Sequence, residues 1–346
     1  METIRELTFV APGQVEFRER PRPAIEGAAQ ALVRPVAVAR CDLDLAFALG
    51  QAPVRGPFGL GHECVGEVVE VGDGVRGVRP GQSVVVPFQI SCGSCARCVA
   101  GQTGSCTAVP PLAAFGLAPL CGTEYGGAIA DLIRVPYADA MLVSLPLGLD
   151  PAAAAALADN AVDGLRTVRT ALARAPGARV LVAGGGALSV GMYAVSAARA
   201  CGAGQVVYVD PSAERAEIAE RLGATAVREV AGPDLQVGRF PIVVDATARP
   251  AGLRFCLAST DLDGLCTSVG IYWEEVPLPL LELYSRGIEF VTGRVHARRE
   301  LPAALELAAA GAFELAPIAT SVVGWDAAPD AWCEPGTKLV VRREAA

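Results

Sequence analysis

The sequence is poor in positive charge and in long hydrophobic runs, and each scarcity excludes a class of protein. Lys338 is the only lysine and the net charge is −8, which argues against general nucleic-acid binding, since that requires a basic surface. The longest alanine stretch, Ala152–Ala156, is short, and no apolar run is long enough to span a bilayer. The charged, alternating N-terminus, METIRELTFVAPGQVEF, predicts a first β-hairpin and not a secretory signal.

Histidine is scarce as well, with only His62 and His296 in the chain, whereas cysteine is plentiful at eleven residues. Four cysteines lie close together between residues 92 and 106, and the others are scattered, several of them in apolar surroundings. Scattered cysteines in a chain without a signal peptide are typical of reduced thiols in the cytosol. We therefore expect a cytoplasmic protein.

The length of 346 residues allows two domains and a large core. Residues 1–150 contain short apolar segments separated by glycine and proline turns, which predicts a β-rich domain with a curled or barrel-like sheet. The predicted strands there include Ala31–Val38, Val65–Val71, Ser83–Pro87 and Ala128–Pro136. From Pro151 to Ala173 the pattern becomes helical and leads into a second kind of domain.

The second domain is organised around the stretch Arg179–Asp210. A short apolar strand is followed by the glycines Gly184–Gly186, a helix over Val190–Cys201, a second strand and then Asp210. This order is typical of a dinucleotide-binding unit. The glycines let the backbone approach a pyrophosphate at the helix N-terminus. Asp210 is placed to bind an adenosine ribose, which predicts NAD and disfavours the 2′-phosphate of NADP.

The spacing of the glycines leaves two alignments with the G-x-G-x-x-G pattern open. A count from Gly184 matches Gly186 but places Ser189 third, and a count from Gly186 places Leu188 second and Gly191 third. Glycines after a strand are also ordinary turn residues, so a βαβ unit without a ligand is the alternative. The candidate pyrophosphate contacts are Gly184, Gly186, Leu188 and Gly191.

After Asp210 strands and helices continue to alternate, which predicts an α/β domain. The expected elements are a helix at Ala213–Leu222, a strand at Ile242–Val244, a helix at Ala251–Ala258 and strands at Leu265–Val269 and Ile288–Thr292. The tail, 294–346, adds a helix at Leu301–Ala310 and a closing strand at Leu339–Arg342. An α/β domain next to a β-rich one predicts a ligand site in the cleft between them.

The most specific motif in the chain is the segment 91–106, SCGSCARCVAGQTGSC. Its cysteines, Cys92, Cys95, Cys98 and Cys106, have the spacing C-x2-C-x2-C-x7-C, which suits four thiolates around one tetrahedral Zn²⁺. Four sulfur ligands leave no position for substrate, so this zinc is predicted to be structural. An iron–sulfur cluster is disfavoured by the last spacing and by Thr107, where a ferredoxin has proline. Disulfides are disfavoured by the close spacing and by the compartment.

A second metal site is indicated by several residues together, although each of them alone is weak evidence for a metal ligand. His62 lies in a Gly-His-Glu triplet at 61–63, and Cys41 follows an apolar strand, three residues before Asp44. Alone, they would be a loop histidine and a buried thiol. Together with the four-cysteine segment, Gly126-Gly127 before a strand and the βαβ unit, they give the chain a resemblance to zinc-containing medium-chain alcohol dehydrogenases over nearly its whole length.

This resemblance implies a GroES-like, β-rich catalytic domain over residues 1–157, a Rossmann cofactor domain with a doubly wound parallel sheet over 158–293, and a return to the catalytic domain over 294–346. It implies a homodimer or homotetramer joined near the edge strand Ile288–Thr292. It also implies further NAD contacts from strand ends and the helix after Asp210, namely Arg215, Thr247, Val269 and Ile271.

The resemblance further implies a catalytic zinc held by Cys41, His62 and a third ligand just before the cofactor domain, where Asp159 matches. Glu63 would be a neighbouring or exchangeable ligand. Cys64 and Cys121 are less favoured substitutes. A Cys/His/Asp set leaves a fourth position for water or substrate, so this second zinc of the chain would be catalytic.

Hydride transfer between NAD(H) and an alcohol or carbonyl substrate is the implied activity, but one position departs from the family pattern. Two residues after the zinc-binding cysteine, family members usually carry a serine or threonine that passes the alcohol proton toward solvent; here the position is Leu43. Asp42, Asp44, Tyr125 or water would then serve, or the reaction needs no relay, as in the reduction of a conjugated C=C bond. A non-catalytic cofactor-binding protein on the same scaffold is a third hypothesis.

The sequence leaves the substrate open, because pocket residues come from loops, including 43–58 and the surroundings of Phe115 and Trp273. His296 and Trp273 are candidates to line the substrate cleft. A surface or core histidine and a packed aromatic residue are the commoner roles of such side chains.

Overall fold

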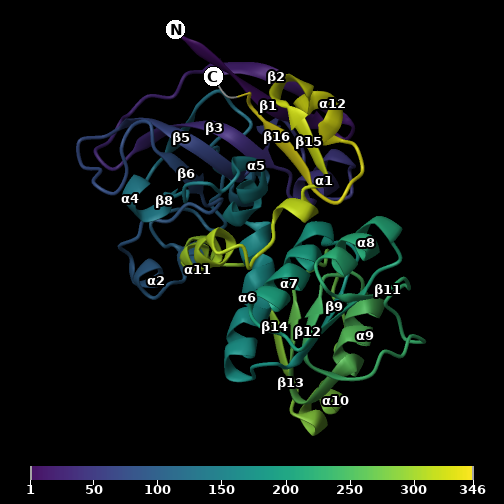
Figure 1. Cartoon of the computed structure of the whole chain (residues 1–346). Helices are drawn as coiled ribbons and strands as arrows, with labels where there is room; N and C mark the ends of the chain where they lie inside the picture. The colour runs from purple at the N-terminus through teal and green to yellow at the C-terminus, as the bar shows by residue number, and fades with distance from the viewer. Residues whose placement is uncertain (1, 345–346) are drawn as a thin grey trace. The chain divides into compact units, whose positions relative to one another are not determined.

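The computed structural model describes residues 2–344, and within them the chain divides into two units (Figure 1). Unit 1 holds the described residues up to Val162, together with His296–Ala309 and the described residues from Ala319 onward. Unit 2 holds Asp163–Val295 and Ala310–Ile318.

These boundaries differ by a few residues from those expected at 157/158 and 293/294. Unit 1 extends to Val162 because Asp159 and Asn160 both contact the Cys41 sulfur within it. The tail does not lie wholly in unit 1. Ala310–Ile318 returns to unit 2, where the ring of Phe313 packs on Tyr193.

Unit 1 is built on a seven-stranded mixed sheet with the order β15-β16-β3-β5-β6-β8, in which β7 also pairs with β3. Its strands are β3 (Ala31–Ala39), β5 (Glu63–Val71), β6 (Ser83–Val86), β7 (Ile133–Val135), β8 (Val143–Ser144), β15 (Ser321–Gly324) and β16 (Leu339–Arg342). A three-stranded sheet contains β1 (Thr3–Ala11), β2 (Gln14–Pro21) and β4 (Phe58–Gly59). The antiparallel pair β1–β2 confirms the N-terminal hairpin.

The pairing of β3 with β5 brings two predicted zinc ligands to one end of the sheet. β3 is largely buried, in keeping with its run of valine and alanine. The two strands are antiparallel and place Ala39 opposite Glu63. Cys41 follows Ala39 by two residues and His62 directly precedes Glu63, so the two side chains start from the same edge.

Unit 2 contains a six-stranded sheet in the order β11-β10-β9-β12-β13-β14, and all its pairs are parallel. The strands are β9 (Arg179–Ala183), β10 (Gln205–Val209), β11 (Thr225–Val227), β12 (Phe240–Asp245), β13 (Thr260–Ser268) and β14 (Glu289–Thr292). The helices that alternate with them are α6 (Asn160–Arg174), α7 (Leu188–Ala200), α8 (Ala213–Arg221), α9 (Pro250–Ser259) and α10 (Leu280–Arg286). Counted from β9, this is the strand order 3-2-1-4-5-6 of a dinucleotide-binding fold, so the expected fold class is confirmed.

Three strands of this sheet end side by side at its carboxyl edge. Ala183 at the end of β9 pairs with Val209 of β10 and with Asp245 of β12. The glycine loop after β9 and Asp210 after β10 are therefore neighbours. Doubly wound sheets bind their ligands at this edge.

The helical segment expected over Pro151–Ala173 is broken at Asp159. α5 (Pro151–Ala154) leads into the 3₁₀ turn η2 (Ala155–Ala158), and α6 starts at Asn160. Asp159 has φ −152° and ψ −85°, well outside the helical range. The break therefore separates the proposed third zinc ligand from both helices.

The remaining helices belong to unit 1. They are α1 (Asp42–Ala48), α2 (Ala96–Val99), α3 (Ala118–Cys121), α4 (Ala138–Met141), α11 (Ala297–Ala309) and α12 (Ala328–Trp332). Among residues 2–344, no helix combines the length and the apolar character that crossing a bilayer requires.

Candidate functional site

Four side chains that are distant in sequence meet at one buried point in unit 1. Ligand atoms of Cys41, His62, Glu63 and Asp159 all lie within 4.8 Å of one another, and all four residues are buried. Cys41 is the N-cap of α1, His62 and Glu63 lie at the start of β5, and Asp159 lies between η2 and α6. The fold thus brings together the four residues that the resemblance implied for a catalytic zinc.

The contacts inside this cluster suit a metal ion better than a closed hydrogen-bond network. His62 Nε2 and Cys41 Sγ each lie 3.4 Å from Asp159 Oδ2. Within the described part of the chain, the buried atom Glu63 Oε2 makes no hydrogen bond, which is costly unless another group satisfies it. Thiolate, imidazole and carboxylate are ligands that Zn²⁺ takes in proteins, and three protein ligands leave a position open. The residues present therefore fit a catalytic zinc.

Asp44 lies behind His62. Its Oδ1 is 3.5 Å from His62 Nδ1, and its Oδ2 accepts the N–H of Cys41 at 3.2 Å. The approach of Asp44 Oδ1 to His62 Nδ1 is an ion-pair contact and not a hydrogen bond, and a carboxylate facing the second nitrogen of a metal-binding histidine favours the tautomer with its N–H on that nitrogen. This buried position makes Asp44 a support for His62 and Cys41.

The excess of acidic groups shifts the protonation of the cluster. Burial alone lowers the pKa of His62, but Asp44 and then Asp159 outweigh it and raise that pKa to about 9. Burial raises the pKa of Glu63 to about 8, against the opposing effect of the Lys338 ammonium. Burial, reinforced by Asp159, also raises the pKa of the Cys41 thiol well above its ordinary value. A divalent cation would relieve this concentration of negative groups.

Among the apolar side chains near the cluster, Phe88 was not singled out from the sequence. The Phe88 ring centroid lies 5.5 Å from that of His62, and the Phe88 N–H donates to the carbonyl of Ala158, one residue before Asp159. Phenylalanine in a loop after a strand gives no sequence signal of such a role. Leu43 and Ala46 are both partly buried and lie three residues apart on α1, so they share a face of that helix.

The substitute ligands considered from the sequence lie outside this cluster. Successive side chains of a strand point to opposite faces, so Cys64 points away from Glu63. The Cys121 sulfur contacts the carbonyl of Thr123 at 3.2 Å. Neither cysteine belongs to a metal-ligand group found among residues 2–344.

A second cluster lies in the four-cysteine loop, 92–106. The sulfur atoms of Cys92, Cys95, Cys98 and Cys106 lie within 4.8 Å of one another, and all four are free thiols. The N–H of Cys95 donates to Cys92 Sγ at 3.3 Å, and the N–H of Cys92 donates to Cys106 Sγ at 3.4 Å. Backbone N–H groups of Thr107 and Cys98 lower the pKa of Cys95 to about 5. Four sulfurs with N–H donors directed at them fit a structural zinc.

His296 supports this loop. Its Nδ1 accepts the N–H of Gly104 at 3.1 Å, two residues before Cys106, and the next residue, Ala297, donates its N–H to Gln89 at 3.2 Å. His296 thus connects the four-cysteine loop to the start of α11, which is a structural role.

The glycine loop of unit 2 is packed too closely to accept side chains. A Cβ atom on Gly184 would overlap the Tyr208 hydroxyl and the Asp210 carboxylate, and one on Gly186 would lie 2.8 Å from Cβ of Ala248. The Gly184 backbone therefore lies directly against Asp210, as the ribose-binding proposal for that residue requires.

The structure combines the two glycine alignments that the sequence left open. A Cβ on Gly191 would lie 3.2 Å from Cβ of Ala246, so Gly191 allows α7 to approach the sheet, while Gly184 and Gly186 form the turn. Leu188 is the first residue of α7, whose N-terminus has no side-chain cap. Such a helix end can bind a phosphate.

Asp210 is fully buried and surrounded by donors. Arg215 binds it in a bidentate manner, with Nε and Nη2 each 2.8 Å from a carboxylate oxygen. The Tyr208 hydroxyl donates to it at 2.9 Å, and the N–H of Ser212 donates at 2.8 Å. The orientation of the carboxylate is therefore fixed before any ligand binds.

The other candidate cofactor contacts differ in exposure. Thr247 is buried, donates its hydroxyl to Asp245 at 2.6 Å, and accepts the N–H of Gly186 at 2.9 Å through its carbonyl. Val269 packs against a small cluster of buried apolar residues. Ile271 is 50% exposed and Trp273 is 49% exposed, so the expectation of a packed aromatic at Trp273 was wrong.

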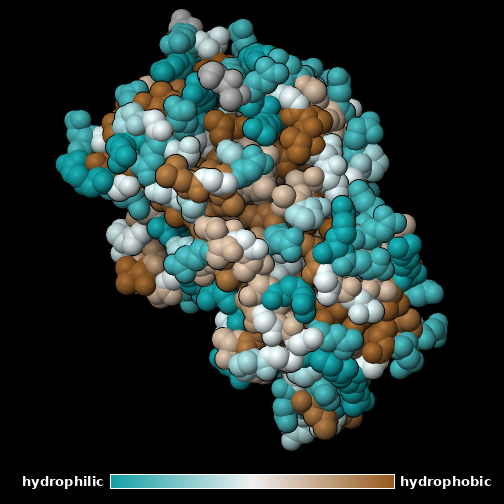
Figure 2. Space-filling model, in the orientation of Figure 1, coloured by the Kyte–Doolittle hydropathy of each residue, from teal (hydrophilic) through white to brown (hydrophobic). Residues whose placement is uncertain are grey.

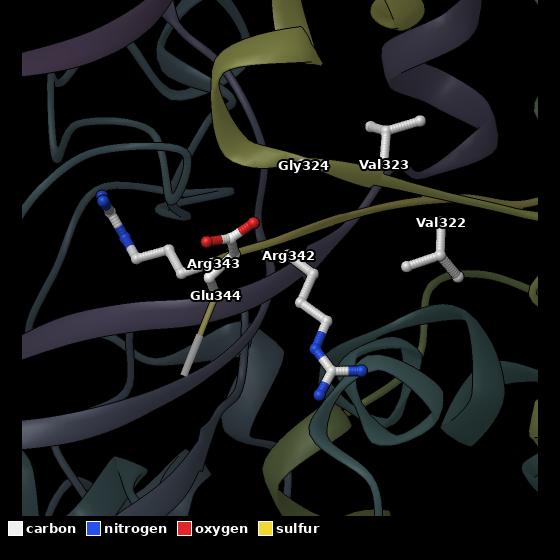
Figure 3. Close-up of a pocket in the computed structure, with 6 residues that line it drawn as sticks. All are labelled: Val322, Val323, Gly324, Arg342, Arg343 and Glu344. Atoms are coloured by element: carbon white, nitrogen blue, oxygen red, sulfur yellow. The ribbon is translucent and has the colours of Figure 1, made fainter. Parts of the chain in front are cut away.

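A separate hollow lies in unit 1 near the C-terminal end of the described chain (Figure 3). Its lining residues are Val322, Val323, Gly324, Arg342, Arg343 and Glu344. Figure 3 shows the two arginines extending in different directions, and Arg343 is already bound to Asp131 at 2.9 Å. None of the candidate metal or cofactor residues lines this hollow.

Comparison with known proteins agrees with the geometry of both units. Residues 27–146 match the family model of the alcohol dehydrogenase GroES-like domain. Residues 189–310 match the family model of the zinc-binding dehydrogenases.

Relatives match over most of their length. A Mycobacterium tuberculosis protein, named as a probable zinc-binding alcohol dehydrogenase, is 31% identical over 330 residues, which cover 94% of this chain and 83% of the relative. The structure of an alcohol dehydrogenase from a Thermus species has a TM-score of 0.87 at 28% identity and covers 98% of this chain and 100% of that one. A candidate zinc-binding dehydrogenase from Sinorhizobium meliloti, solved with NADP, has a TM-score of 0.80 at 26% identity, with coverages of 99% and 100%.

Proposed function

Because the chain belongs to the zinc-containing medium-chain dehydrogenase/reductase family and is an oxidoreductase of that kind, we propose that it transfers hydride reversibly between NAD(H) and an alcohol/carbonyl pair. The observation that most strongly supports this proposal is the convergence of Cys41, His62 and Asp159 at one buried point. A set of three such ligands with an open position is typical of a catalytic zinc site.

The residues of unit 1 have distinct tasks in this proposal. Cys41, His62 and Asp159 hold the zinc, which supplies Lewis acidity toward the substrate oxygen. Asp44 keeps the imidazole of His62 oriented, and the burial of the cluster excludes bulk water. Phe88 provides an apolar wall beside His62, which favours a substrate with a carbon chain or ring next to its oxygen.

The four-cysteine loop holds a second zinc in this proposal, which makes two per chain. Its four sulfur ligands leave no open position, so the ion contributes order to the loop and no chemistry. Metal counting separates the enzyme from a non-catalytic scaffold protein. Two zinc ions per chain support the enzyme, whereas a single ion would favour the scaffold.

A preference for NAD over NADP is part of the proposal. The nicotinamide ring of the bound cofactor donates or accepts the hydride. The glycine loop binds the pyrophosphate of the cofactor, and Asp210 binds its adenosine ribose. The buried Asp210 carboxylate would repel a 2′-phosphate, and Arg215 does not offset this because its Nε and Nη2 already bind that carboxylate. The Sinorhizobium relative was solved with NADP, so the preference rests on Asp210 and not on family membership.

The test is an assay of NAD⁺ reduction by the purified, zinc-loaded protein with a panel of primary and secondary alcohols. We expect turnover with at least one class of alcohol. Cys41→Ser should lower that activity about 10³-fold, since Lewis-acid assistance contributes several kcal/mol, while NADH binding persists. A zinc-loaded protein that neither binds NADH nor turns over any alcohol would contradict the proposal.

The apolar face of α1 favours a second candidate function, reduction of a conjugated C=C bond. Leu43 stands where the family usually has a hydroxyl, and Ala46 on the same face offers no exchangeable proton either. Such a reduction does not need a proton relay through the substrate oxygen. With NADH and an α,β-unsaturated aldehyde, an unsaturated alcohol as product supports the first function, and a saturated aldehyde supports the second.

Self-association is also proposed, as a homodimer or homotetramer joined through the free edge of β14. This strand ends the sheet of unit 2, and the preceding helix α10 exposes Leu280, Leu281 and Tyr284 by 67%, 81% and 85%. Figure 2 shows apolar side chains among hydrophilic ones at the position that α10 has in Figure 1. A second copy could cover such an edge and its apolar neighbours.

The small-molecule substrate and the free thiols support a cytoplasmic enzyme without nucleic-acid or membrane partners.

A further inference from the structure

The chain contains one lysine and one asparagine, and the two side chains bind each other beside the metal-ligand cluster of unit 1. Lys338 Nζ donates to Asn160 Oδ1 at 2.7 Å, across a sequence separation of 178 residues. Every other basic side chain with a permanent charge is an arginine. The lysine ammonium is a compact charge with three donors, so it can bind several acceptors that converge on one point.

Lys338 is held in place by three acceptors. Besides Asn160, its ammonium donates to Glu63 Oε1 at 2.7 Å and to the carbonyl of Arg40 at 3.0 Å. The side chains of Lys338 and Glu63 are both 0% exposed. A buried charge is tolerated only when it is paired and hydrogen-bonded, so this ammonium is a fixed part of the site and is not available to ligands from solution.

Asn160 joins the lysine to two of the zinc ligands. Its amide Nδ2 donates to Asp159 Oδ2 at 3.0 Å and to Cys41 Sγ at 3.3 Å. Its amide oxygen is oriented by Lys338, which fixes which end of the amide faces the ligands. A single side chain therefore donates to a carboxylate and a sulfur that the proposed zinc requires.

We propose that Lys338 and Asn160 are a positioning pair that assembles the catalytic zinc site before the ion binds. Asn160 aligns Asp159 and Cys41, while Lys338 offsets the crowded negative charge and restrains Glu63 through one oxygen. The other oxygen, Glu63 Oε2, makes no hydrogen bond among the described residues and faces the ion as an exchangeable ligand, so the open position is kept for substrate. This inference rests on the catalytic zinc of the proposed function.

The physical reason for such a pair is mutual repulsion. Ligand atoms of Cys41, Glu63 and Asp159 lie within 4.8 Å of one another, so the ionised forms that a metal ion requires repel one another until the ion is bound. An ammonium and an amide donor keep them in place, so less reorganisation is needed when the ion arrives. Both side chains are buried and bind metal-ligand residues, so the pair acts through those residues.

The experiment is a competition titration of the metal-depleted, full-length protein with Zn²⁺ against a chromogenic chelator. Wild type should bind two ions. Lys338→Met and Asn160→Ala should each bind the four-cysteine ion as wild type does but bind the other ion about 10–100-fold more weakly, the usual effect of removing a residue that orients metal ligands. The Co²⁺-substituted variants should also show altered visible absorption, because their metal ligands no longer have the wild-type geometry.

Arg20→Met is the matched control, since Arg20 is paired with Glu6, another buried carboxylate of unit 1 outside the metal clusters. It should leave both affinities unchanged. If Lys338→Met does not fold, Asn160→Ala decides the question. Variants that bind the second ion within about twofold of wild type, with the same Co²⁺ spectrum, would overturn the positioning role. A wild-type protein that binds only one ion would instead overturn the proposed function itself.

Discussion

Among single residues, Asp159 has the most central position in the site. Its Oδ2 faces Cys41 Sγ, His62 Nε2 and Asn160 Nδ2 at distances of 3.4, 3.4 and 3.0 Å. The break in the helical segment allows Asp159 to face all three atoms. Within a regular helix, the backbone geometry would fix the direction of its side chain. A carboxylate is a chemically harder ligand than a thiolate, so the Cys/His/Asp set is harder than a set with two cysteines and one histidine.

Removal of this carboxylate should therefore remove one metal ion. We expect Asp159→Ala to lower the zinc content from two ions per chain to one and to reduce dehydrogenase activity about 10³-fold, as loss of Lewis-acid assistance implies. Metal analysis of the folded variant measures this. Asp163→Ala is the control, since Asp163 lies four residues further on and pairs with Arg166 outside the cluster. Retention of two ions by Asp159→Ala would exclude it as a ligand.

A second prediction at this scale concerns Asp210 and Arg215. Asp210→Ala removes the negative charge and frees the guanidinium for a 2′-phosphate, so the NADPH/NADH affinity ratio should rise about tenfold or more. Fluorescence titration with the two cofactors measures the ratio. Adding Arg215→Met to the first substitution should abolish the gain. Equal binding of both cofactors by wild type would show that Asp210 does not select NAD.

The residues of the candidate metal cluster could be predicted from the sequence, because Cys41, His62 and Asp159 match a known pattern. The side chains that orient them could not. The contact between Lys338 and Asn160 joins residues 178 positions apart, and the local sequence around either residue does not indicate it. Phe88 was missed for the same reason, since only tertiary structure brings it to His62.

At the scale of elements, the prediction was most accurate where strands are buried on both faces. β9 and β12 are continuous apolar runs, as parallel strands of a covered sheet should be. Short elements were missed. α1 has only seven residues, DLDLAFA, and β11 only three, which is too few for a clear periodic pattern. The break at Asp159 was missed because its alanine-rich surroundings favour a helix.

The four-cysteine loop should lose its order when its ion is removed. We expect Cys98→Ser to lose one zinc, to lower the unfolding temperature, and to open the segment 92–106 to proteolysis, because the regular structure of this segment consists of two short helical turns, α2 and η1 (Thr103–Ser105). Limited proteolysis with mass spectrometry locates the cuts. Cys121→Ser, a thiol outside both clusters, should behave as wild type. An intact, uncut loop in Cys98→Ser would argue against a structural ion.

The helix before β14 carries the prediction for self-association. Leu281 is 81% exposed on α10, so Leu281→Arg places a charge where the second copy is proposed to pack and should shift the solution mass toward the monomer. Sedimentation or light scattering measures the mass. Leu147→Arg is the control, because Leu147 is fully exposed in a loop of unit 1. An unchanged oligomer in Leu281→Arg would place the interface elsewhere.

At the scale of the whole molecule, each unit carries one part of the proposed chemistry. Both metal clusters lie within unit 1, and the glycine loop with Asp210 lies within unit 2. This division could be predicted from the change in sequence pattern near residue 150. The substrate could not, because side chains such as Leu43 and Phe88 are placed by loops and helix ends that the pattern does not specify.

The central claim is hydride transfer at the Cys41–His62–Asp159 site, and it can be tested by following the hydride itself. The zinc-loaded protein is incubated with C4-deuterated NADH, prepared as both stereoisomers, and a panel of aldehydes and ketones, and the products are analysed by mass spectrometry. The account predicts one deuterium on the carbinol carbon of a product alcohol from one stereoisomer, and none with Cys41→Ser. A protein that holds two zinc ions yet transfers no deuterium to any carbonyl, or that transfers it equally well as Cys41→Ser, would contradict the account.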